Sequence, residues 1–291
     1  MTDQAAQPEV SLVDRISSEY YNLTAREKIA ADYVIGHRAE SQTMSITELS
    51  DACGVAEATL SRFVRRLGYP GYSDFKIDLI RSISTSDQEL SPLSGEIGSR
   101  DSFSDVCRKL YASDVDAITQ TMNLLDESEI CRAADIIIAA QKVFCMGQGG
   151  SMILAEEAAH LFTTSGCKYF SVSDNHTQAI TAATMDKTDA LLYFSYSGAT
   201  TDMMHTLAIV KSRGAKVILI TRFPNSPGAR YADVILKCGA QESPLQLGSV
   251  PAKISQLFLM DVLFSEVCRR DLDECRRARS RIADVLADKH L

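Results

Sequence analysis

The stretch Leu191-Leu192-Tyr193-Phe194-Ser195-Tyr196-Ser197-Gly198-Ala199-Thr200-Thr201-Asp202 decides the fold of the second half of this 291-residue chain. It begins as an apolar, aromatic run and then changes abruptly to small hydroxyl residues and glycine. The residues that follow, 203–210, have apolar side chains at helical spacing. This order predicts a buried strand that ends in a polar turn at the start of a helix.

A polar turn at a helix start can bind a phosphate group. The first backbone N–H groups of a helix lack partners within the helix and lie at the positive end of its dipole. Ser195, Ser197, Thr200 and Thr201 would add hydroxyl donors, and Gly198 lets the backbone come close to the anion. The alternative is that Ser-Gly-Thr after a strand forms only a turn and a helix cap.

Strands and helices alternate around this stretch. Further strands are predicted at 143–146, 168–172, 216–221 and 234–237, and helices at 103–125, 127–140, 152–164, 250–270 and 273–287. Such alternation is typical of an α/β fold with a parallel, doubly wound sheet. The second half of the chain is therefore predicted to form a three-layer α/β domain.

A second polar turn, Gly147-Gln148-Gly149-Gly150-Ser151, follows the strand at 143–146. In an open parallel sheet, ligands bind at the carboxyl ends of the strands, so this turn and the Ser195 turn could line one pocket. A glycine-rich turn also occurs at nucleotide sites and in plain loops. The acidic ribose partner expected roughly 20 residues further on in an NAD site is missing, because the next strand ends in Phe170-Ser171-Val172-Ser173. We therefore predict no NAD and no other cofactor.

The first 83 residues predict a small all-helical domain. The helical pattern that starts at Leu12 contains the capping-box sequence Thr24-Ala25-Arg26-Glu27 and predicts a first long helix. A second box, Ser45-Ile46-Thr47-Glu48, opens a short helix that Gly54 ends, and another helix runs over about 56–67. Two short helices joined by a glycine turn are typical of a helix-turn-helix motif.

The second helix of this motif presents small polar residues early and arginines late. Ala58, Thr59, Ser61 and Arg62 are expected to be exposed and to approach base edges in the major groove of double-stranded DNA. The side chains expected to contact phosphates are Arg65, Arg66, Lys76 and Arg81. The alternative is an ordinary three-helix bundle with a solvated basic face.

Composition limits the class of protein. A hydrophobic content of 45% is enough for a globular core, and the formal net charge of −8 disfavours indiscriminate coating of nucleic acid. The apolar runs are too short for a membrane span and the start lacks the order of a signal peptide, so a cytoplasmic protein without membrane contact is expected. The eight cysteines form no Cys-x-x-Cys pair, which favours reduced, buried cysteines over a disulfide or metal framework.

Residues 45–76 resemble the N-terminal DNA-binding domain of the RpiR (MurR/RpiR) family of bacterial transcription regulators. The resemblance rests on Arg62-Phe63, Leu67-Gly68-Tyr69, Gly71-Tyr72 and Phe75-Lys76. One departure is Ala56, which stands where the family usually has the serine that caps the recognition helix. Losing a cap costs on the order of 1 kcal/mol, so this helix is expected to depend on packing or DNA.

Residues of about 140–240 resemble the SIS (sugar isomerase) domain, a flavodoxin-like doubly wound fold that binds phosphorylated sugars. The resemblance implies a helix-turn-helix domain over 1–83, a linker over 84–102 and a SIS domain over 103–291. It also implies a sugar phosphate effector, regulation of sugar metabolism, and pairing through helices into a homodimer or homotetramer. By matching position, the effector residues are Gly149, Ser151, Ser195, Ser197, Gly198 and Thr200.

Two titratable residues leave the choice between binding and catalysis open. His176, in Asp174-Asn175-His176-Thr177-Gln178, could bond a sugar hydroxyl or cap the following helix. Glu242 lies in a turn-rich stretch that leads to Ser249 and Lys253, and enzymes of this superfamily often use a glutamate for proton transfer. A regulator without enzymatic activity is the main prediction, and a phosphosugar isomerase with an added helical domain is the alternative.

Overall fold

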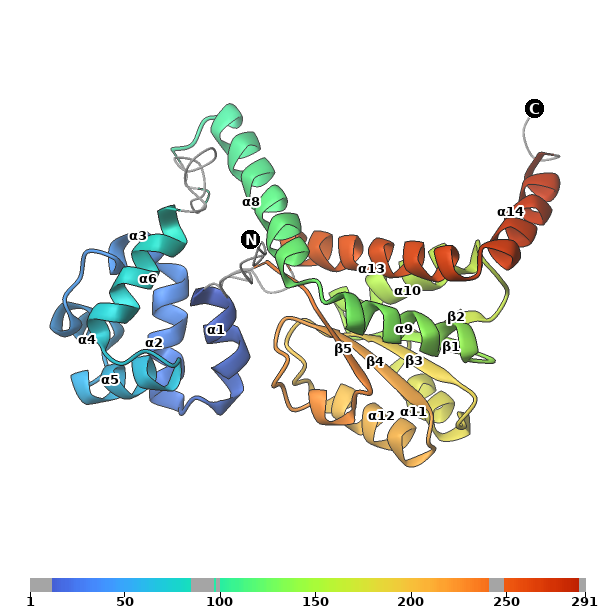
Figure 1. Ribbon diagram of the computed structural model, residues 1–291, viewed down its shortest axis with the longest axis horizontal. Helices are drawn as coiled ribbons and strands as arrows, with labels where there is room; N and C mark the ends of the chain where they lie inside the picture. Colours follow the sequence, from blue (N-terminus) through green and yellow to red (C-terminus); the bar gives the residue numbers. More distant parts are fainter. Residues whose placement is uncertain (1–11, 85–96, 98–99, 241–248, 288–291) are drawn as a thin grey trace, which may run out of the picture. The chain divides into compact units, whose positions relative to one another are not determined.

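A computed structural model gives the fold and describes residues 12–84, 97, 100–240 and 249–287 (Figure 1). The chain divides into two compact units, Met1–Ser113 and Asp114–Leu291. The division falls inside helix α8 (Phe103–Leu124), which the sequence-based bounds place wholly in the second domain. Most of the predicted linker at 84–102 lies outside the described residues, and those bounds stay a prediction.

The N-terminal unit is a bundle of short helices, as predicted (Figure 1). Its elements are α1 (Leu12–Glu19), η1 (Tyr20–Asn22), α2 (Ala25–Gly36), α3 (Arg38–Ser41), α4 (Ile46–Cys53), α5 (Glu57–Arg66) and α6 (Tyr72–Ser84). The predicted first long helix is divided into α1 and α2, because Leu23 is extended and Thr24 caps a new helix. Leu49, Leu60, Phe63 and Phe75 are fully buried in the shared core.

Both capping boxes are confirmed. The side chains of Thr24 and Ser45 accept hydrogen bonds from the N–H groups of Glu27 and Glu48, and each glutamate accepts one from the N–H of its cap residue. Gly54 ends α4 in the left-handed conformation, with φ +65°. Ala56 offers α5 no side-chain cap, as the sequence implied. Instead, Thr47 of α4 donates a hydrogen bond to Glu57 in the first turn of α5.

Glu27 joins the start of α2 to the end of α5. Its carboxylate accepts hydrogen bonds of 2.8 Å from both the N–H and the hydroxyl of Thr24, and it lies 3.5 Å from Nε of Arg66. Burial raises the pKa of this carboxyl group. The two hydrogen bonds from Thr24 and the charges of Arg66 and Arg62 lower the pKa by more, so it lies below its ordinary value of 4.5. Glu27 therefore stabilises the domain in its ionised form.

We expect Glu27→Gln to destabilise the N-terminal domain by about 1–2 kcal/mol at neutral pH, because a buried charge-assisted cap is lost. The contribution of Glu27 is fully present above its unfolded pKa and disappears as the pH falls through its depressed folded pKa. Urea unfolding followed by circular dichroism at pH 7 and at lower pH measures both effects. The matched control is Glu48→Gln, at the exposed capping box of α4, which should cost less; equal losses for the two variants would contradict the role given to Arg66.

The C-terminal unit contains one five-stranded parallel sheet in the order β2-β1-β3-β4-β5. Its strands are β1 (Val143–Gly147), β2 (Tyr169–Ser171), β3 (Ala190–Phe194), β4 (Lys216–Thr221) and β5 (Val234–Lys237), close to the predicted ranges. This is the flavodoxin-like doubly wound order, in which the winding reverses between β1 and β3. The predicted fold class is confirmed.

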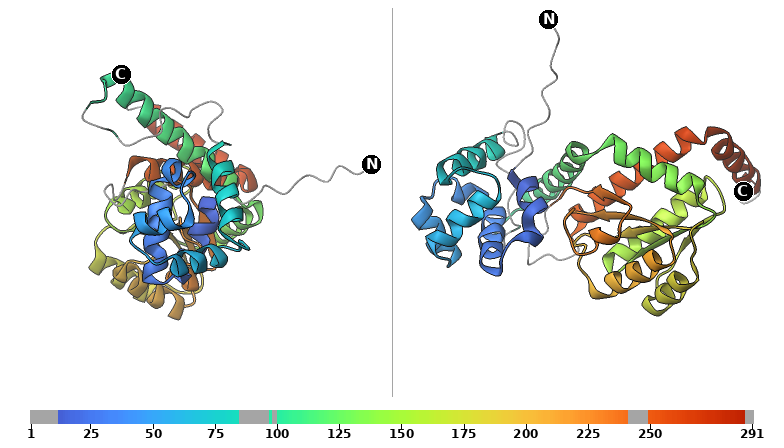
Figure 2. Two further views of the ribbon diagram at one scale, coloured as in Figure 1. Left: turned by 90° about the vertical axis from the view of Figure 1, so that its left-hand side faces the viewer. Right: turned by 60° about the horizontal axis from the view of Figure 1, so that its bottom comes forward.

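Helices cover both faces of the sheet (Figures 1 and 2). One face packs against α9 (Glu127–Ala139), α10 (Gly150–Thr163) and α13 (Val250–Arg270), and the other against α11 (Asn175–Thr184) and α12 (Thr201–Ser212). Along β3, Leu192 and Phe194 point to the first face while Leu191 and Tyr193 point to the second. The chain continues from α13 into α14 (Leu272–Ala287).

Two further expectations concern the burial of the cysteines and the absence of a membrane-spanning helix. All eight cysteines are free thiols; five are buried, but Cys107 and Cys167 are exposed and Cys131 is half-buried, so the expectation that they all serve as small core residues is wrong for these three. Among the described helices, none has the length and apolar character needed to cross a membrane.

Candidate functional site

The turns after β1 and β3 begin side by side. Gly147, the last residue of β1, pairs with Phe194, the last residue of β3, so the segments that follow leave the sheet together at the point where the winding reverses. A Cβ on Gly147 would lie 2.5 Å from the carbonyl oxygen of Ser151, because α10 folds back closely over the strand end. The structure thus brings together the two turns that the sequence singled out.

The turn after β3 is held in place by a hydrogen bond within the turn itself. Ser195 is buried, and its hydroxyl accepts a hydrogen bond of 3.1 Å from the N–H of Gly198. Gly198 has φ +62°, and a Cβ on it would lie 2.1 Å from Oγ of Ser226 and 3.0 Å from Oγ1 of Thr221. Ser195 therefore shapes the turn, and only glycine fits at position 198.

Three further hydroxyls lie around these turns. Ser197 is half-buried and its Oγ accepts a bond of 3.4 Å from the N–H of Ala199, while Thr200 is exposed at the start of α12. Ser151 is half-buried in the first turn of α10. A hydroxyl that accepts one hydrogen bond can still donate its proton to an anion.

The two helices that start at these turns differ from their neighbours in capping. Helices α9, α11 and α13 are each capped by a side chain, from Asp126, Asp174 and Ser249 respectively. Within the described residues, the cap positions of α10 and α12, which are Gly149 and Thr200, give no side-chain hydrogen bond to the helix. These two helix starts thus lack the side-chain cap that the other three have, although in α10 the N–H groups of Ser151 and Met152 donate to the carbonyl oxygens of Gln148 and Gly149.

Lys253 adds positive charge near the start of α10. Its Cε and Nζ lie 3.1 and 3.6 Å from the position that a Cβ on Gly150 would occupy. Lys253 was not among the predicted site residues, because it lies far along the chain in the first turns of α13 and no spacing rule connects it to Gly150. The nearby Ser249 caps α13 and lies before it.

The segment Asp174–Gln178 has a clear structural role. Asp174 caps α11 by accepting from the N–H of Thr177. Gln178 is fully buried, and its side-chain amide donates to the carbonyl oxygens of Gly147 at 3.0 Å and Val172 at 2.8 Å, which joins α11 to the ends of β1 and β2. His176 between them is exposed. It is Asp174, and not His176, that caps this helix.

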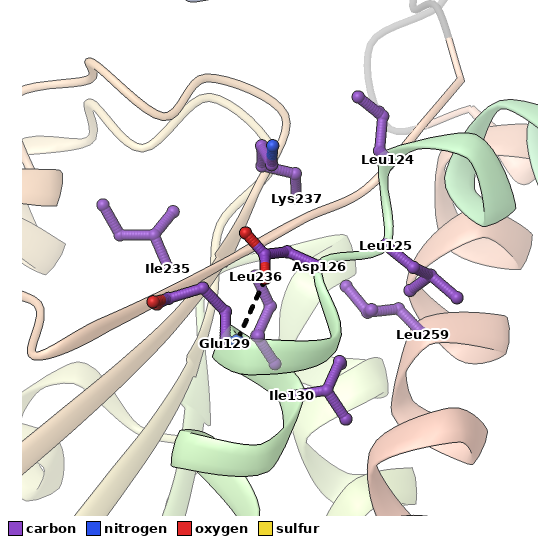
Figure 3. A pocket seen from close by; sticks show the side chains of 9 residues that line it. All are labelled: Leu124, Leu125, Asp126, Glu129, Ile130, Ile235, Leu236, Lys237 and Leu259. Atoms are coloured by element: carbon purple, nitrogen blue, oxygen red, sulfur yellow. Dashed lines mark hydrogen bonds between the residues drawn. The ribbon is translucent and has the colours of Figure 1, made fainter. Parts of the chain in front are cut away.

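Glu242 lies outside the described residues, so its predicted role stays a prediction. Within the part of the chain that the structure describes, no cluster of His, Cys, Asp or Glu is placed to hold a metal ion. A crevice between α9 and β5, shown in Figure 3, is lined by Leu125, Ile130 and Leu236 among others and encloses only about 10 Å³, which is room for a single water.

In the N-terminal unit, α5 is amphipathic in the way a recognition helix requires. Leu60, Phe63 and Val64 are buried, while Ala58 and Arg62 are exposed. The expectation that Thr59 is exposed is wrong: it is 7% exposed, and its hydroxyl accepts a bond of 3.2 Å from the guanidinium of Arg62. Thr59 lies beside Leu60 on the inner side of the helix, and its hydrogen bond orients the side chain of Arg62. Ser61 is half-buried.

The basic residues of this unit are engaged to different degrees. Arg66 donates to the carbonyl oxygen of Asn22 and pairs with Glu27, so it belongs to the fold. Lys76 donates to the carbonyl oxygens of Thr43 and Met44, at 3.1 and 2.8 Å, and steadies the segment before α4. The side chain of Arg65 is exposed and forms no hydrogen bond or ion pair with any described residue.

The comparisons with known proteins agree with this two-part architecture. Residues 10–86 match the family model described as the helix-turn-helix domain of the rpiR family, and residues 136–266 match the SIS domain model. An uncharacterised HTH-type transcriptional regulator of Haemophilus influenzae is 29% identical over 282 residues, which cover 97% of this chain and 98% of that protein. The HTH-type transcriptional regulator RpiR of Escherichia coli K12 is 26% identical over 272 residues, with 94% and 91% covered.

One solved structure spans both units. The Vibrio vulnificus NanR protein, complexed with ManNAc-6P, is 25% identical, has a TM-score of 0.62, and covers 96% of this chain and 99% of its own. The order of the two matched regions is the order of the two units described above. This chain therefore carries the helix-turn-helix domain of the rpiR family at its N-terminus and a SIS domain after it, and its full-length relatives are HTH-type transcriptional regulators.

Proposed function

We propose that this regulator binds a sugar phosphate in its SIS domain and that binding changes its affinity for DNA. The observation that carries the proposal is the pair of helix starts, at Gly149 and Thr200, that lack side-chain caps and flank the switch point of the sheet. Ser151, Ser197 and Thr200 supply hydroxyl donors there, and Lys253 supplies a positive charge. A phosphate dianion matches this combination of backbone N–H groups, hydroxyls and an ammonium group.

The sugar itself is expected to lie beyond the phosphate, towards the start of α11. There His176 is exposed, and the amide of Asn175 donates a 3.0 Å bond to the carboxylate of Asp202 at the start of α12. These side chains offer both donors and acceptors for sugar hydroxyls. Because NanR is complexed with ManNAc-6P, that compound is the first to test on this protein.

The relatives support a protein that binds the sugar phosphate without converting it. The two full-length relatives above are named transcriptional regulators. The isomerase alternative needs a base positioned at the sugar, and of its two candidates His176 is exposed at the start of α11 while Glu242 is outside the described residues. Turnover of ketose or aldose phosphates that vanishes in Glu242→Gln would favour the enzyme instead.

We also propose that the protein forms a homodimer or homotetramer. Ile118 and Met122 of α8 are 38% and 59% exposed. Beside Ile118, an open groove between α8, α10 and α13 is lined by Leu161, Leu257 and Phe258 and edged by acidic side chains. A second copy of the SIS domain would cover this apolar surface, as monomers rarely leave such patches open.

The sugar phosphate proposal can be tested on the full chain by thermal unfolding with ManNAc-6P and other hexose, pentose and amino-sugar phosphates. A ligand at 100 times its Kd stabilises the folded state by about 2.7 kcal/mol and raises the Tm. We expect Ser197→Ala to weaken binding of the active compound by about 1–3 kcal/mol in calorimetry, through loss of a charge-assisted hydrogen bond. Ser212→Ala, which removes an exposed hydroxyl at the end of α12, is the control and should bind normally. Equal affinities for all three proteins would remove Ser197 from the site.

A further inference from the structure

The peptide of Ala240, just after β5, has an unusual conformation. Its φ is +79°, and it is the one non-glycine residue among those described that has a positive φ. This region of backbone conformation is unfavourable for a residue with a Cβ, so the surrounding contacts must hold Ala240 in place. Two hydrogen bonds do so: its N–H donates to Oε1 of Gln120 at 3.2 Å, and its carbonyl oxygen accepts from the hydroxyl of Tyr196 at 3.0 Å.

On one side, this peptide is fixed to α8. Gln120 also donates from its Nε2 to Asp116 one turn earlier, so both ends of its amide are engaged. The neighbouring N–H of Gly239 donates to Oγ1 of Thr121 at 2.9 Å. A Cβ on Gly239 would lie 2.5 Å from Cβ of Gln120 and 2.6 Å from N of Thr121, so α8 and this strand end are in direct contact.

On the other side, the peptide is fixed to the turn after β3. Tyr196 lies between Ser195 and Ser197 in the turn proposed to bind phosphate, and its ring stacks edge-on against Phe223 at 5.8 Å. Its carbonyl oxygen accepts from the N–H of Arg222 and from the hydroxyl of Thr221, each at 3.0 Å. The hydroxyl of Tyr196 reaches the carbonyl oxygen of Ala240. Any movement of the turn on binding moves this hydroxyl with it.

We propose that Tyr196 is a positioning residue that transmits effector binding from the turn at 195–200, through the Ala240 peptide, to Gln120 and Thr121 of α8. This inference rests on the proposed sugar phosphate site. Helix α8 runs from Phe103 to Leu124, and in sequence it follows the segment after the DNA-binding domain. A shift of α8 is therefore the step by which occupancy of the turn alters the orientation or mobility of the N-terminal unit. Coupling of this kind needs a continuous physical contact between the two ends, and a strained peptide that is hydrogen-bonded on both sides supplies such a contact.

The first test uses the full chain without ligand. Tyr196→Phe removes only the hydroxyl, so hydrogen–deuterium exchange followed by mass spectrometry should become at least about threefold faster in peptides covering 116–124 and 236–240. Gln120→Leu breaks the same path from the other end and should speed exchange in the turn at 195–200, because coupling is reciprocal. The control is Tyr231→Phe, whose hydroxyl accepts a bond from Arg230 at the surface and which should match the parent.

The second test adds inorganic phosphate as a probe. In the parent, phosphate should slow exchange in the turn at 195–200 and also change exchange at 116–124. Tyr196→Phe should keep the first response, with phosphate affinity within about threefold, and lose the second. The proposal is overturned if Tyr196→Phe exchanges like the parent in the first test, or if it transmits the phosphate response to 116–124 unchanged. If phosphate leaves the parent's turn unaltered, the proposed phosphate site fails, and the ligand-free test still decides the role of Tyr196.

Discussion

Gly198→Ala is expected to lose at least about a hundredfold in affinity for any sugar phosphate, a change of about 2.7 kcal/mol. Two independent effects act at this position. The backbone has φ +62°, which costs an alanine about 1–2 kcal/mol, and the new Cβ would lie 2.1 Å from Oγ and 2.6 Å from Cβ of Ser226. The turn must therefore rearrange, and its rearrangement breaks the bond from the N–H of Gly198 to Ser195 and moves Ser197 and Thr200. Calorimetry with the compound found in the thermal screen measures the loss.

Gly214→Ala provides the matched control for this variant. Gly214, after α12 in the same unit, has φ +80°, but a Cβ there meets only Cβ of Lys187 at an ordinary 3.7 Å. The Gly214→Ala variant therefore has the same kind of backbone strain, but no collision like that with Ser226 and no contact with the turn after β3. It should bind the effector as the parent does. A Gly198→Ala protein that is folded and binds as tightly as Gly214→Ala would show that the turn after β3 is not the phosphate site.

The parts of the fold that were predictable from sequence are those fixed by local patterns. Apolar runs such as 191–194 identified the strands, and the capping boxes at Thr24 and Ser45 identified two helix starts. Parallel strands place their carboxyl ends at one edge, so the pairing of Gly147 with Phe194 follows from the topology.

The features that the sequence did not reveal depend on contacts between distant residues. Helical spacing placed Thr59 on the outer side of α5, but its position beside Leu60 turns it inward, where it holds Arg62. Lys253 reaches Gly150, and the Tyr196 hydroxyl reaches Ala240, only because α13 and the segment after β5 pack beside the turns. No short-range pattern marks such pairs. The positive φ of Ala240 is equally hidden, since the residue type that usually signals it is glycine.

Arg65→Ala is expected to weaken DNA binding by about tenfold at low salt, because a phosphate contact from an exposed guanidinium is lost. The slope of log K against log salt concentration should become less steep by about 0.9, the value for one phosphate contact on duplex DNA. Arg65 is the suitable residue, since it lies exposed in the last turn of α5 and pairs with no described residue. The measurement is fluorescence anisotropy with a generic labelled DNA duplex at several salt concentrations, because phosphate contacts do not depend on the operator sequence.

Arg66→Ala separates DNA contact from folding at the adjacent position. Arg66 donates to the carbonyl oxygen of Asn22 at 2.9 Å and lies beside the buried Glu27, so its loss leaves that carboxylate without its ion-pair partner. This variant should lower the Tm more than Arg65→Ala does and change the salt slope less. The reverse order, with Arg65→Ala destabilising the fold and leaving the salt slope intact, would mean that α5 does not face the DNA backbone. An exposed arginine that contacts a DNA phosphate releases a counterion, so removing it should change the salt slope. A salt slope unchanged in both variants would therefore favour a protein-binding role for the N-terminal unit.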